Sequence, residues 1–322
     1  MALMSYLEAS KAALAAEMRR DGTVWALGED LGRGGVFGQY KGLAEEFGPE
    51  RIVDTPISEA TIMGAAVGAA LMGTRPVVEM RFADFALCAV DELVNQAAKA
   101  RYMFGGQGRV PLVVRQPIGM WRSSAAQHSQ SLEGWYAHIP GLVVVCPATP
   151  ACNYGLLRSA IRCDDPVVYM EHKDIWAMPG EVDEAAPLIP LGKARLVCEG
   201  REVTLVAWSG VLRAVEAALD HLGGRPSVEV IDLRTIYPWD KEMVFASVRK
   251  TGRLLVVHEA VETGGFGAEI AATVAEELFA SLKGPVRRLG APRIPIPYAP
   301  SLEAVCKVSP AKIAETVRAM VG

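Results

Sequence analysis

Glu59 is the residue whose type and surroundings most directly suggest chemistry in this 322-residue sequence. It follows a short apolar run at 51–54 and precedes a stretch, 60–69, made almost entirely of small and apolar residues. Such a stretch predicts a buried helix with an ionisable group at its mouth, and an unpaired buried charge is strongly destabilising. We therefore expect Glu59 to have a partner, and that partner need not be protein.

Two further segments carry residues suited to chemistry. His128 lies between Gln127 and Ser129 in a polar loop beyond a predicted strand, where α/β proteins commonly place their sites. No cysteine or acid is close to it in sequence, so this histidine can be read either as structural or as functional. Phe82 and Phe85 follow another predicted strand and can be read either as ordinary core or as a flat platform for a ring.

Two glycine-rich segments, 32–38 and 264–267, do not fit the known phosphate-binding patterns. Neither has the Gly-x-Gly-x-x-Gly spacing of a dinucleotide-binding loop, and no Gly-x-x-x-x-Gly-Lys-Ser/Thr occurs in the chain. The sequence therefore argues against a nicotinamide dehydrogenase or a nucleotidase, and we interpret these segments as flexible turns.

The composition is typical of a globular protein with no nucleic-acid partner, because the net charge is −4 and no long run of like charge occurs. The six cysteines form no Cys-x-x-Cys pair, so we expect reduced thiols. The N-terminal region lacks the basic-then-apolar order of a signal peptide, and the most apolar stretch, 62–72, is too short to cross a bilayer. We expect a cytoplasmic protein with no membrane partner.

Short β-branched runs alternate with helical patterns, and this order predicts an α/β fold with doubly wound sheets. Strands are expected at 24–27, 76–79, 111–114, 142–145, 166–169, 203–206, 228–231 and 254–257. Helices are expected at 5–20, 61–73, 87–104, 151–162, 211–221, 240–250, 266–281 and 310–321. Prolines and acids at about 176–190 indicate a linker, which divides the chain into two α/β domains, 1–185 and 186–322.

Motifs of one protein family occur along nearly the whole chain. They are Asp54-Thr55-Pro56-Ile57-Ser58-Glu59, Phe82-Ala83-Asp84-Phe85, Asn95-Gln96-Ala97-Ala98-Lys99, Arg101-Tyr102-Met103-Phe104-Gly105-Gly106, Ala125-Ala126-Gln127-His128-Ser129-Gln130, His138-Ile139-Pro140-Gly141-Leu142, and His258-Glu259-Ala260 followed by Gly264-Gly265-Phe266-Gly267-Ala268-Glu269. In these motifs the chain resembles the β subunits of the thiamine-diphosphate-dependent decarboxylating component of 2-oxo acid dehydrogenase complexes, of pyruvate, acetoin and branched-chain types. The resemblance implies a pyrimidine-type thiamine-diphosphate-binding domain followed by a transketolase C-terminal-like domain.

The resemblance also implies roles for individual residues. The glutamate that Glu59 matches bonds the N1′ nitrogen of the cofactor's aminopyrimidine, and this bond drives the amino–imino switch that activates the cofactor. Phe85 matches an aromatic residue that stacks on the pyrimidine, with Ile57 beside it. His128 matches a histidine at the thiazolium end that serves acyl transfer to a lipoyl arm. Glu29 matches an acid near the cofactor, for which structural and functional readings are both open.

Some family members also hold a structural potassium ion through backbone carbonyls and one side chain. The matching positions here are Leu112, Ala160, Ile161, Cys163 and Asp165. Cys163 and Asp165 stand where some relatives have Asp and Asn, so the resemblance implies this site less firmly than the cofactor site.

The chain lacks the Gly-Asp-Gly segment with which thiamine diphosphate enzymes hold the diphosphate through Mg²⁺. The resemblance therefore implies that a separate α subunit supplies Mg²⁺ and the other half of each site, in an α2β2 heterotetramer that is the only active form. The small residues Gly64, Ala65, Gly68 and Ala69 suit a close interface. A dihydrolipoyl acyltransferase core with its lipoyl domain is the further expected partner.

Two alternatives stay open beside this catalytic β subunit. One is a non-catalytic assembly subunit with the same fold, and the other is a fragment of transketolase or of deoxyxylulose phosphate synthase. Joint presence of Glu59, Phe85 and His128 favours the catalytic role, because a scaffold has no physical reason to keep a costly acid. Among substrates, pyruvate or acetoin is expected ahead of branched-chain 2-oxo acids.

Overall fold

The computed structural model describes residues 1–322, and the chain forms two compact units. The first comprises 1–118 and 136–191, and the second comprises 119–135 and 192–322. The predicted boundary near 185 stays a prediction. No helix is both long enough and apolar enough to span a bilayer, and all six cysteines are free thiols.

The first unit is built on a parallel sheet in the strand order β6-β7-β5-β4-β2-β3. These strands are almost continuously apolar because both faces are covered. A short antiparallel pair joins β1 to β8. The strands are β1 (Ala2–Ser5), β2 (Val24–Gly28), β3 (Ile52–Asp54), β4 (Arg75–Glu79), β5 (Val113–Ile118), β6 (Val143–Val145), β7 (Val167–His172) and β8 (Pro179–Val182).

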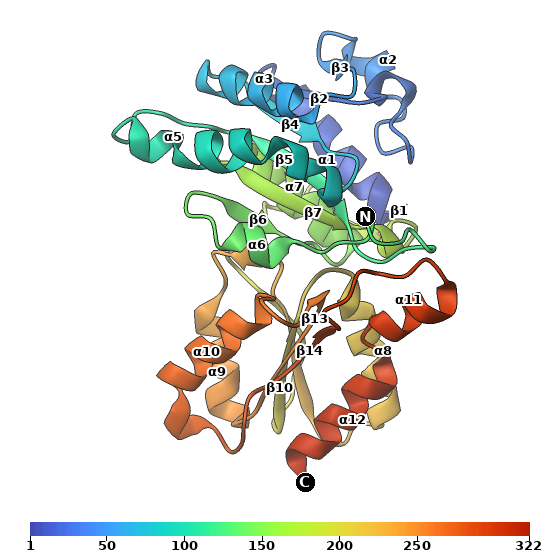
Figure 1. The fold of residues 1–322 in the computed structure, drawn as a ribbon, viewed down its shortest axis with the longest axis vertical. Coiled ribbons are helices and arrows are strands. Elements are labelled where there is room, and N and C mark those ends of the chain that lie inside the picture. Colours follow the sequence, from blue (N-terminus) through green and yellow to red (C-terminus); the bar gives the residue numbers. More distant parts are fainter. The chain divides into compact units, whose positions relative to one another are not determined.

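Helices cover both faces of this sheet (Figure 1). Helices α1 and α7 pack together with strand residues such as Val77 and Val167 in one core cluster, while α3 and the segment 91–103 lie on the opposite face. The helices are α1 (Tyr6–Arg20), α2 (Leu43–Phe47), α3 (Glu59–Leu71), α4 (Ala83–Ala86), a π-helix (Asp91–Ala97), α5 (Ala98–Met103), α7 (Pro150–Arg162) and 3₁₀ turns at Leu31–Arg33, Leu87–Ala89 and Lys173–Ile175. Helix α6 (Glu133–Ala137) begins in the second unit and ends in the first.

The second unit has a five-stranded sheet in the order β14-β13-β10-β11-β9, in which only β9 is antiparallel. Figure 1 shows α9 and α10 on one side of this sheet and α8 and α12 on the other. Its elements are β9 (Arg195–Cys198), β10 (Val203–Ala207), α8 (Leu212–Leu222), β11 (Val228–Asp232), β12 (Thr235–Tyr237), α9 (Lys241–Thr251), β13 (Leu254–Val261), α10 (Gly267–Glu277), β14 (Arg287–Ala291), α11 (Pro300–Cys306), α12 (Pro310–Val321) and 3₁₀ turns at Ser209–Val211 and Phe279–Ser281.

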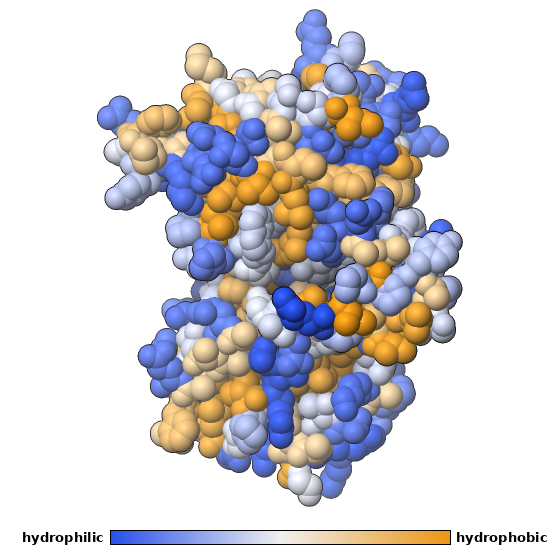
Figure 2. All heavy atoms as spheres, in the orientation of Figure 1, coloured by the Kyte–Doolittle hydropathy of each residue, from blue (hydrophilic) through white to orange (hydrophobic).

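Helix α11 carries an exposed apolar surface in this second unit. Leu302 and Val305 are exposed on it, and Figure 2 shows apolar atoms gathered over this helix. The opposite side of α11 buries Glu303 and Cys306. The helix is therefore attached to its unit by one face only.

Most predicted elements are confirmed, with four corrections. The helix expected at 266–281 ends at Glu277 and is followed by the 3₁₀ turn Phe279–Ser281. The helix expected at 87–104 is broken into a 3₁₀ turn, a π-helix and α5, since a hydrophobic pattern does not distinguish these windings. The strand expected at 111–114 begins only at Val113 and continues to Ile118. Helix α3 is not buried all round: Ile62 and Ala66 are buried, whereas Gly64 and Gly68 are exposed.

Candidate functional site

The candidate site lies at the carboxyl ends of three adjacent parallel strands in the first unit. Strand β2 lies between β3 and β4, and its last residue, Gly28, pairs in register with Asp54 on one side and Glu79 on the other. Ligand sites of open α/β sheets form at this edge. The segments that follow β2, β3 and β4 carry four of the predicted residues: Glu29, Ile57, Glu59 and Phe85.

Gly28 allows the strand ends to approach closely. Its φ is +156°, and a Cβ at this position would lie 2.7 Å from the carbonyl oxygen of Glu79. On the other side, Asp54 accepts a 2.7 Å hydrogen bond from the backbone N–H of Gly32 and so holds the turn after β2 against the end of β3. These two contacts fix where Glu29 emerges.

Acidic side chains outnumber the one base at this edge. Arg81 Nε lies 3.0 Å from Glu29 Oε2, and the same guanidinium also pairs with Asp30. Burial raises the pKa of Glu29, the Arg81 charge opposes that rise, and the nearby Glu59 charge adds to it. Glu59 and Glu29 are therefore close enough to feel each other's charge, and a group that donates a proton or hydrogen bond here would relieve the repulsion.

An aromatic and apolar surface accompanies these acids. Phe85 on α4 is half-buried and meets Phe82 edge to face, with ring centroids 5.5 Å apart. Ile57, just before Glu59, is 78% exposed. A half-buried ring and an exposed aliphatic side chain beside carboxylates provide contacts for a flat heterocycle with polar edges.

The expectation that Glu59 lies at the mouth of a buried helix requires correction. Glu59 is only half-buried in this chain, at the start of α3, because only one face of α3 packs on its own unit. The exposed face of α3 includes Gly64, Ala65 and Gly68, the small residues expected at an interface. This chain alone therefore gives Glu59 less burial than the sequence suggested.

His128 belongs to the loop 119–135 of the second unit and is half-buried there. The four residues at the strand ends lie within the first unit, and His128 lies outside it. The sequence placed all five in one domain, 1–185, and the grouping of 119–135 with the later part of the chain carries no local sequence signal.

Three of the five positions that match a potassium site contact an arginine, and the other two accept backbone N–H groups. Arg75 Nη1 donates to the carbonyl oxygens of Ile161 and Cys163, each at 3.0 Å. Leu112 O accepts from the Val167 N–H at 2.8 Å, Ala160 O accepts from the Cys163 N–H at 3.1 Å, and Asp165 pairs with Arg101. A guanidinium and a metal cation repel each other, so Arg75 at the carbonyls of Ile161 and Cys163 argues against a potassium ion beside them. The potassium site stays a prediction.

Sequence reasoning missed a sealed ionic cluster beneath the site. Arg115 is 1% exposed and lies 2.6 Å from Glu171 and 3.5 Å from Glu79. The Tyr40 hydroxyl donates to Glu79 at 3.0 Å, and the Asn153 amide donates to Glu171 at 3.0 Å. Burial raises the pKa of Glu79 to about 7, with Arg115 opposing and Glu171 adding to the rise. Charged residues inside otherwise apolar strand patterns were the available signal.

Two family models match this chain, and together they define its class. The model described as transketolase, pyrimidine binding domain, matches residues 2–177, and that described as transketolase, C-terminal domain, matches residues 192–313. A solved structure described as a split gene transketolase, inactive beta4 tetramer, has the same fold, with a TM-score of 0.81 over 99% of this chain and 98% of that one at 21% identity. The molecule is thus a transketolase-type two-domain α/β protein.

Curated relatives narrow this class. The 2-oxoisovalerate dehydrogenase subunit beta of Bacillus subtilis is 42% identical over 99% of this chain and 98% of its own length. The acetoin:2,6-dichlorophenolindophenol oxidoreductase subunit beta of Cupriavidus necator is 43% identical over 94% and 93%. The pyruvate dehydrogenase E1 component subunit beta of Rhizobium meliloti is 41% identical over 99% and 70%. The chain belongs to the family of β subunits of thiamine-diphosphate-dependent 2-oxo acid and acetoin dehydrogenases.

Proposed function

We propose that this chain is the catalytic β subunit of a thiamine-diphosphate-dependent dehydrogenase that cleaves a 2-oxo acid or acetoin and transfers the acyl group to a lipoyl domain. The observation that carries the proposal is the set of Glu29, Glu59, Arg81 and Phe85 at the carboxyl ends of β2, β3 and β4. Excess carboxylate beside a half-buried ring suits a cofactor whose ring nitrogen must be protonated.

Each residue of this chain then has a defined task. Glu59 would hydrogen-bond the N1′ nitrogen of the bound cofactor and share a proton with it, and the charge of Glu29 would keep the local potential negative. Phe85 stacks on the pyrimidine, and Ile57 excludes water beside it. His128 stabilises charge or moves a proton at its imidazole during acyl transfer. When bound, thiamine diphosphate supplies the nucleophilic carbon and the electron sink for cleavage next to a carbonyl.

An α subunit completes the site in this proposal and supplies Mg²⁺ for the diphosphate, because this chain contains no Gly-Asp-Gly segment. The exposed small residues of α3 support an α2β2 assembly, since they allow another helix to approach closely. The exposed apolar residues of α11 give the C-terminal domain a surface for the acyltransferase core. Action in the cytoplasm stays a prediction.

Pyruvate or acetoin is the proposed substrate class, and branched-chain 2-oxo acids are the alternative. Relatives named for 2-oxoisovalerate, acetoin and pyruvate are 42%, 43% and 41% identical to this chain, so overall identity does not rank the three. The domain limits 1–185 and 186–322 form part of the same proposal.

We include no potassium ion. Arg75 instead supplies the positive charge for the carbonyls of Ile161 and Cys163, and its Nη2 also donates to Asp164 at 2.7 Å. A covalently attached guanidinium does not dissociate, so the stability of the region around these carbonyls should not depend on which salt cation is present.

The proposed function is tested by Glu59→Gln in the assembled heteromer. The amide cannot hold the proton that the carboxyl holds, so dye-linked decarboxylation should fall by roughly 10²–10⁴-fold, the usual scale of a lost proton-transfer group. Glu45→Gln is the matched control, because Glu45 is also an acid in the first turn of a helix but is exposed on α2. Normal turnover of an assembled Glu59→Gln protein would instead support the non-catalytic assembly subunit.

A further inference from the structure

The loop 119–135, here called the His128 loop, contains residues in a strained backbone conformation. Arg122, Ser123 and Ala125 have φ values of 47°, 59° and 59°, in the left-handed region that residues with a Cβ rarely adopt. No helix or strand occurs between Gly119 and Leu132 to support them. Within the loop, the Ser124 N–H donates to Trp121 O at 3.1 Å and the Gly119 N–H donates to Gln130 O at 3.4 Å. Contacts with other parts of the second unit supply further support.

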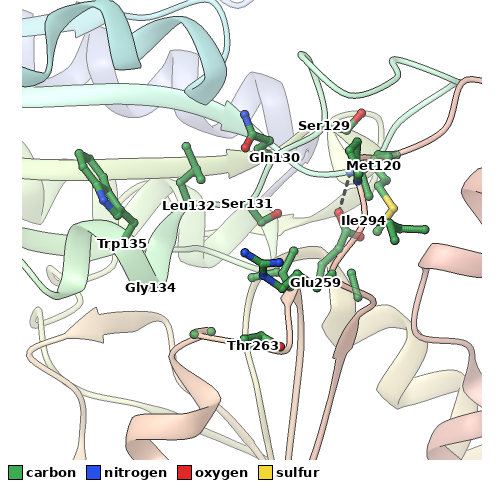
Figure 3. A pocket seen from close by; sticks show the side chains of 18 of the residues that line it. Met120, Ser129, Gln130, Ser131, Leu132, Gly134, Trp135, Glu259, Thr263 and Ile294 are labelled. Carbon is green, nitrogen blue, oxygen red and sulfur yellow. Dashed lines mark hydrogen bonds between the residues drawn. The ribbon is translucent and has the colours of Figure 1, made fainter.

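Two carboxylates from distant elements hold the loop by its backbone. Glu259 on β13 accepts a 2.6 Å hydrogen bond from the Met120 N–H, and Glu303 on α11 accepts a 2.9 Å bond from the Ser123 N–H. Figure 3 shows Glu259 directed at Met120, with this bond dashed. Hydrogen bonds to an ionised acceptor are stronger than neutral ones, and Glu303 is only 6% exposed, which limits competition from water.

Side-chain contacts hold both ends of the same loop in place. Met120 is buried in a cluster with Ala291, Ile296 and Cys306. At the other end, Glu133 accepts a 3.0 Å hydrogen bond from Trp208 Nε1. Loop residues and Glu259 also line one cavity of about 510 Å³ in this unit (Figure 3). The loop is thus held near its start by the packing of Met120, near its end by the Glu133–Trp208 hydrogen bond, and at its strained centre by Glu303.

We propose that Glu259 and Glu303 are positioning residues that hold the His128 loop in the one conformation that presents the His128 imidazole for acyl transfer. This inference rests on the proposed function, and neither carboxylate touches the reacting atoms. Glu303 is the more decisive of the two, because its hydrogen bond ends on Ser123, one of the strained residues.

The kinetic test uses the assembled heteromer and reads lipoyl-domain acylation beside dye-linked decarboxylation. Glu303→Ala should lower kcat for acylation about 10- to 100-fold with KM nearly unchanged, the range of a misplaced catalytic group. Glu303→Gln should recover most of that loss, since its amide oxygen still accepts the Ser123 N–H. Glu303→Ala combined with His128→Ala should be no slower than His128→Ala alone. Glu202→Ala is the control, because Glu202 likewise accepts a backbone N–H, from Ser227 at 2.6 Å, outside the loop.

A second measurement is independent of catalysis. Arg122 is exposed, so trypsin cleavage after it in the folded full-length chain reports loop opening. Glu303→Ala and Glu259→Ala should be cut several-fold faster than the parent, while Glu202→Ala should be cut at the parental rate.

Four outcomes would overturn the inference: normal acylation by Glu303→Ala, unchanged cleavage in Glu303→Ala, fully additive losses in the double variant, or no recovery with Glu303→Gln. Its failure is distinguishable from failure of the proposed function. Normal acylation by Glu303→Ala, with Glu59→Gln and His128→Ala both defective, removes only the inference. Normal turnover by Glu59→Gln removes the function itself.

Discussion

Two ionic clusters in the first unit have an excess of acid over base, and they differ in burial. At the strand ends, Arg81 pairs with Glu29, which is 10% exposed, and with Asp30, which is 42% exposed. Inside the sheet, Arg115 pairs with Glu79 and Glu171, and none of these side chains is more than 4% exposed. The same kind of imbalance therefore occurs in two dielectric environments.

The comparison shows that burial decides whether an excess carboxyl group is protonated by the protein or left charged at a site. In the sealed cluster no solvent stabilises the second negative charge, so burial raises the pKa of Glu79 to about 7. The Tyr40 hydroxyl donates a hydrogen bond to the same carboxyl group. At the strand ends the acids are only partly desolvated and face a site. The excess carboxylate at the strand ends is therefore available to bind a ligand. We interpret the first cluster as structural and the second as functional.

The largest expected effect on the free energy of unfolding comes from removing the Arg115 guanidinium, and removing Arg81 is the matched comparison. Arg115→Met should lower the free energy of unfolding by about 3–5 kcal/mol, because two buried acids lose their counter-charge. The matched change Arg81→Met should cost less, about 1 kcal/mol, since Asp30 is 42% exposed and Glu29, at 10%, still reaches solvent. Urea unfolding of the two full-length variants measures both values. Equal losses, or a larger loss for Arg81→Met, would remove the distinction between the clusters.

The proton on Glu79 predicts a specific pH dependence of stability. Its pKa in the folded chain is about 7 and its ordinary value is 4.5, so between these limits the folded chain binds the proton more tightly than the unfolded chain. The free energy of unfolding should therefore fall as the pH rises from about 4.5 through 7, by an amount on the order of 3 kcal/mol from this group. Glu79→Gln mimics the protonated acid and should flatten that slope.

Unfolding midpoints at pH 5, 6, 7 and 8 measure this slope. Glu17→Gln is a useful comparison, because Glu17 is an acid of the same unit whose pKa is lowered, with Arg162 and Arg20 outweighing its burial. Because the pKa of Glu17 in the folded chain lies below its ordinary value of 4.5, Glu17→Gln should leave the slope between pH 5 and 8 unchanged. An unaltered slope in Glu79→Gln would show that the surplus charge inside the sheet is balanced in another way.

The fold and the strand-end residues were predictable, because apolar strand runs and the residues directly after them are local in sequence. Local patterns singled out Glu59 and Phe85, the family resemblance added Glu29 and Ile57, and all four follow strands β2, β3 and β4. What it could not predict depends on long-range pairing. The carboxylates that hold the His128 loop lie 139 and 180 residues from their backbone partners, and no periodicity reports such bonds. The burial of Glu59 was overestimated, since a run of small residues does not say which of its faces packs within the same chain.

Arg75 gives a smaller effect than Arg115 and extends the comparison to a third guanidinium, which donates to backbone carbonyls. Its side chain is 23% exposed, between the sealed Arg115 and the open surface. Arg75→Met leaves the carbonyls of Ile161 and Cys163 without this donor, so the free energy of unfolding should fall by about 1–2 kcal/mol in choline chloride. Potassium chloride at the same ionic strength should restore part of that loss, because the vacated oxygens suit a hard cation.

The parent chain should show equal stability in the two salts. Arg109→Met is the control: Arg109 pairs with Asp164 at 3.0 Å but is 65% exposed and is not a donor to these carbonyls, so its removal should create no preference for potassium. If the parent itself is selectively stabilised by potassium, the guanidinium does not replace a cation. The region around the Ile161 and Cys163 carbonyls would then resemble the strand-end site, where the protein leaves negative charge unbalanced and a bound ligand balances it.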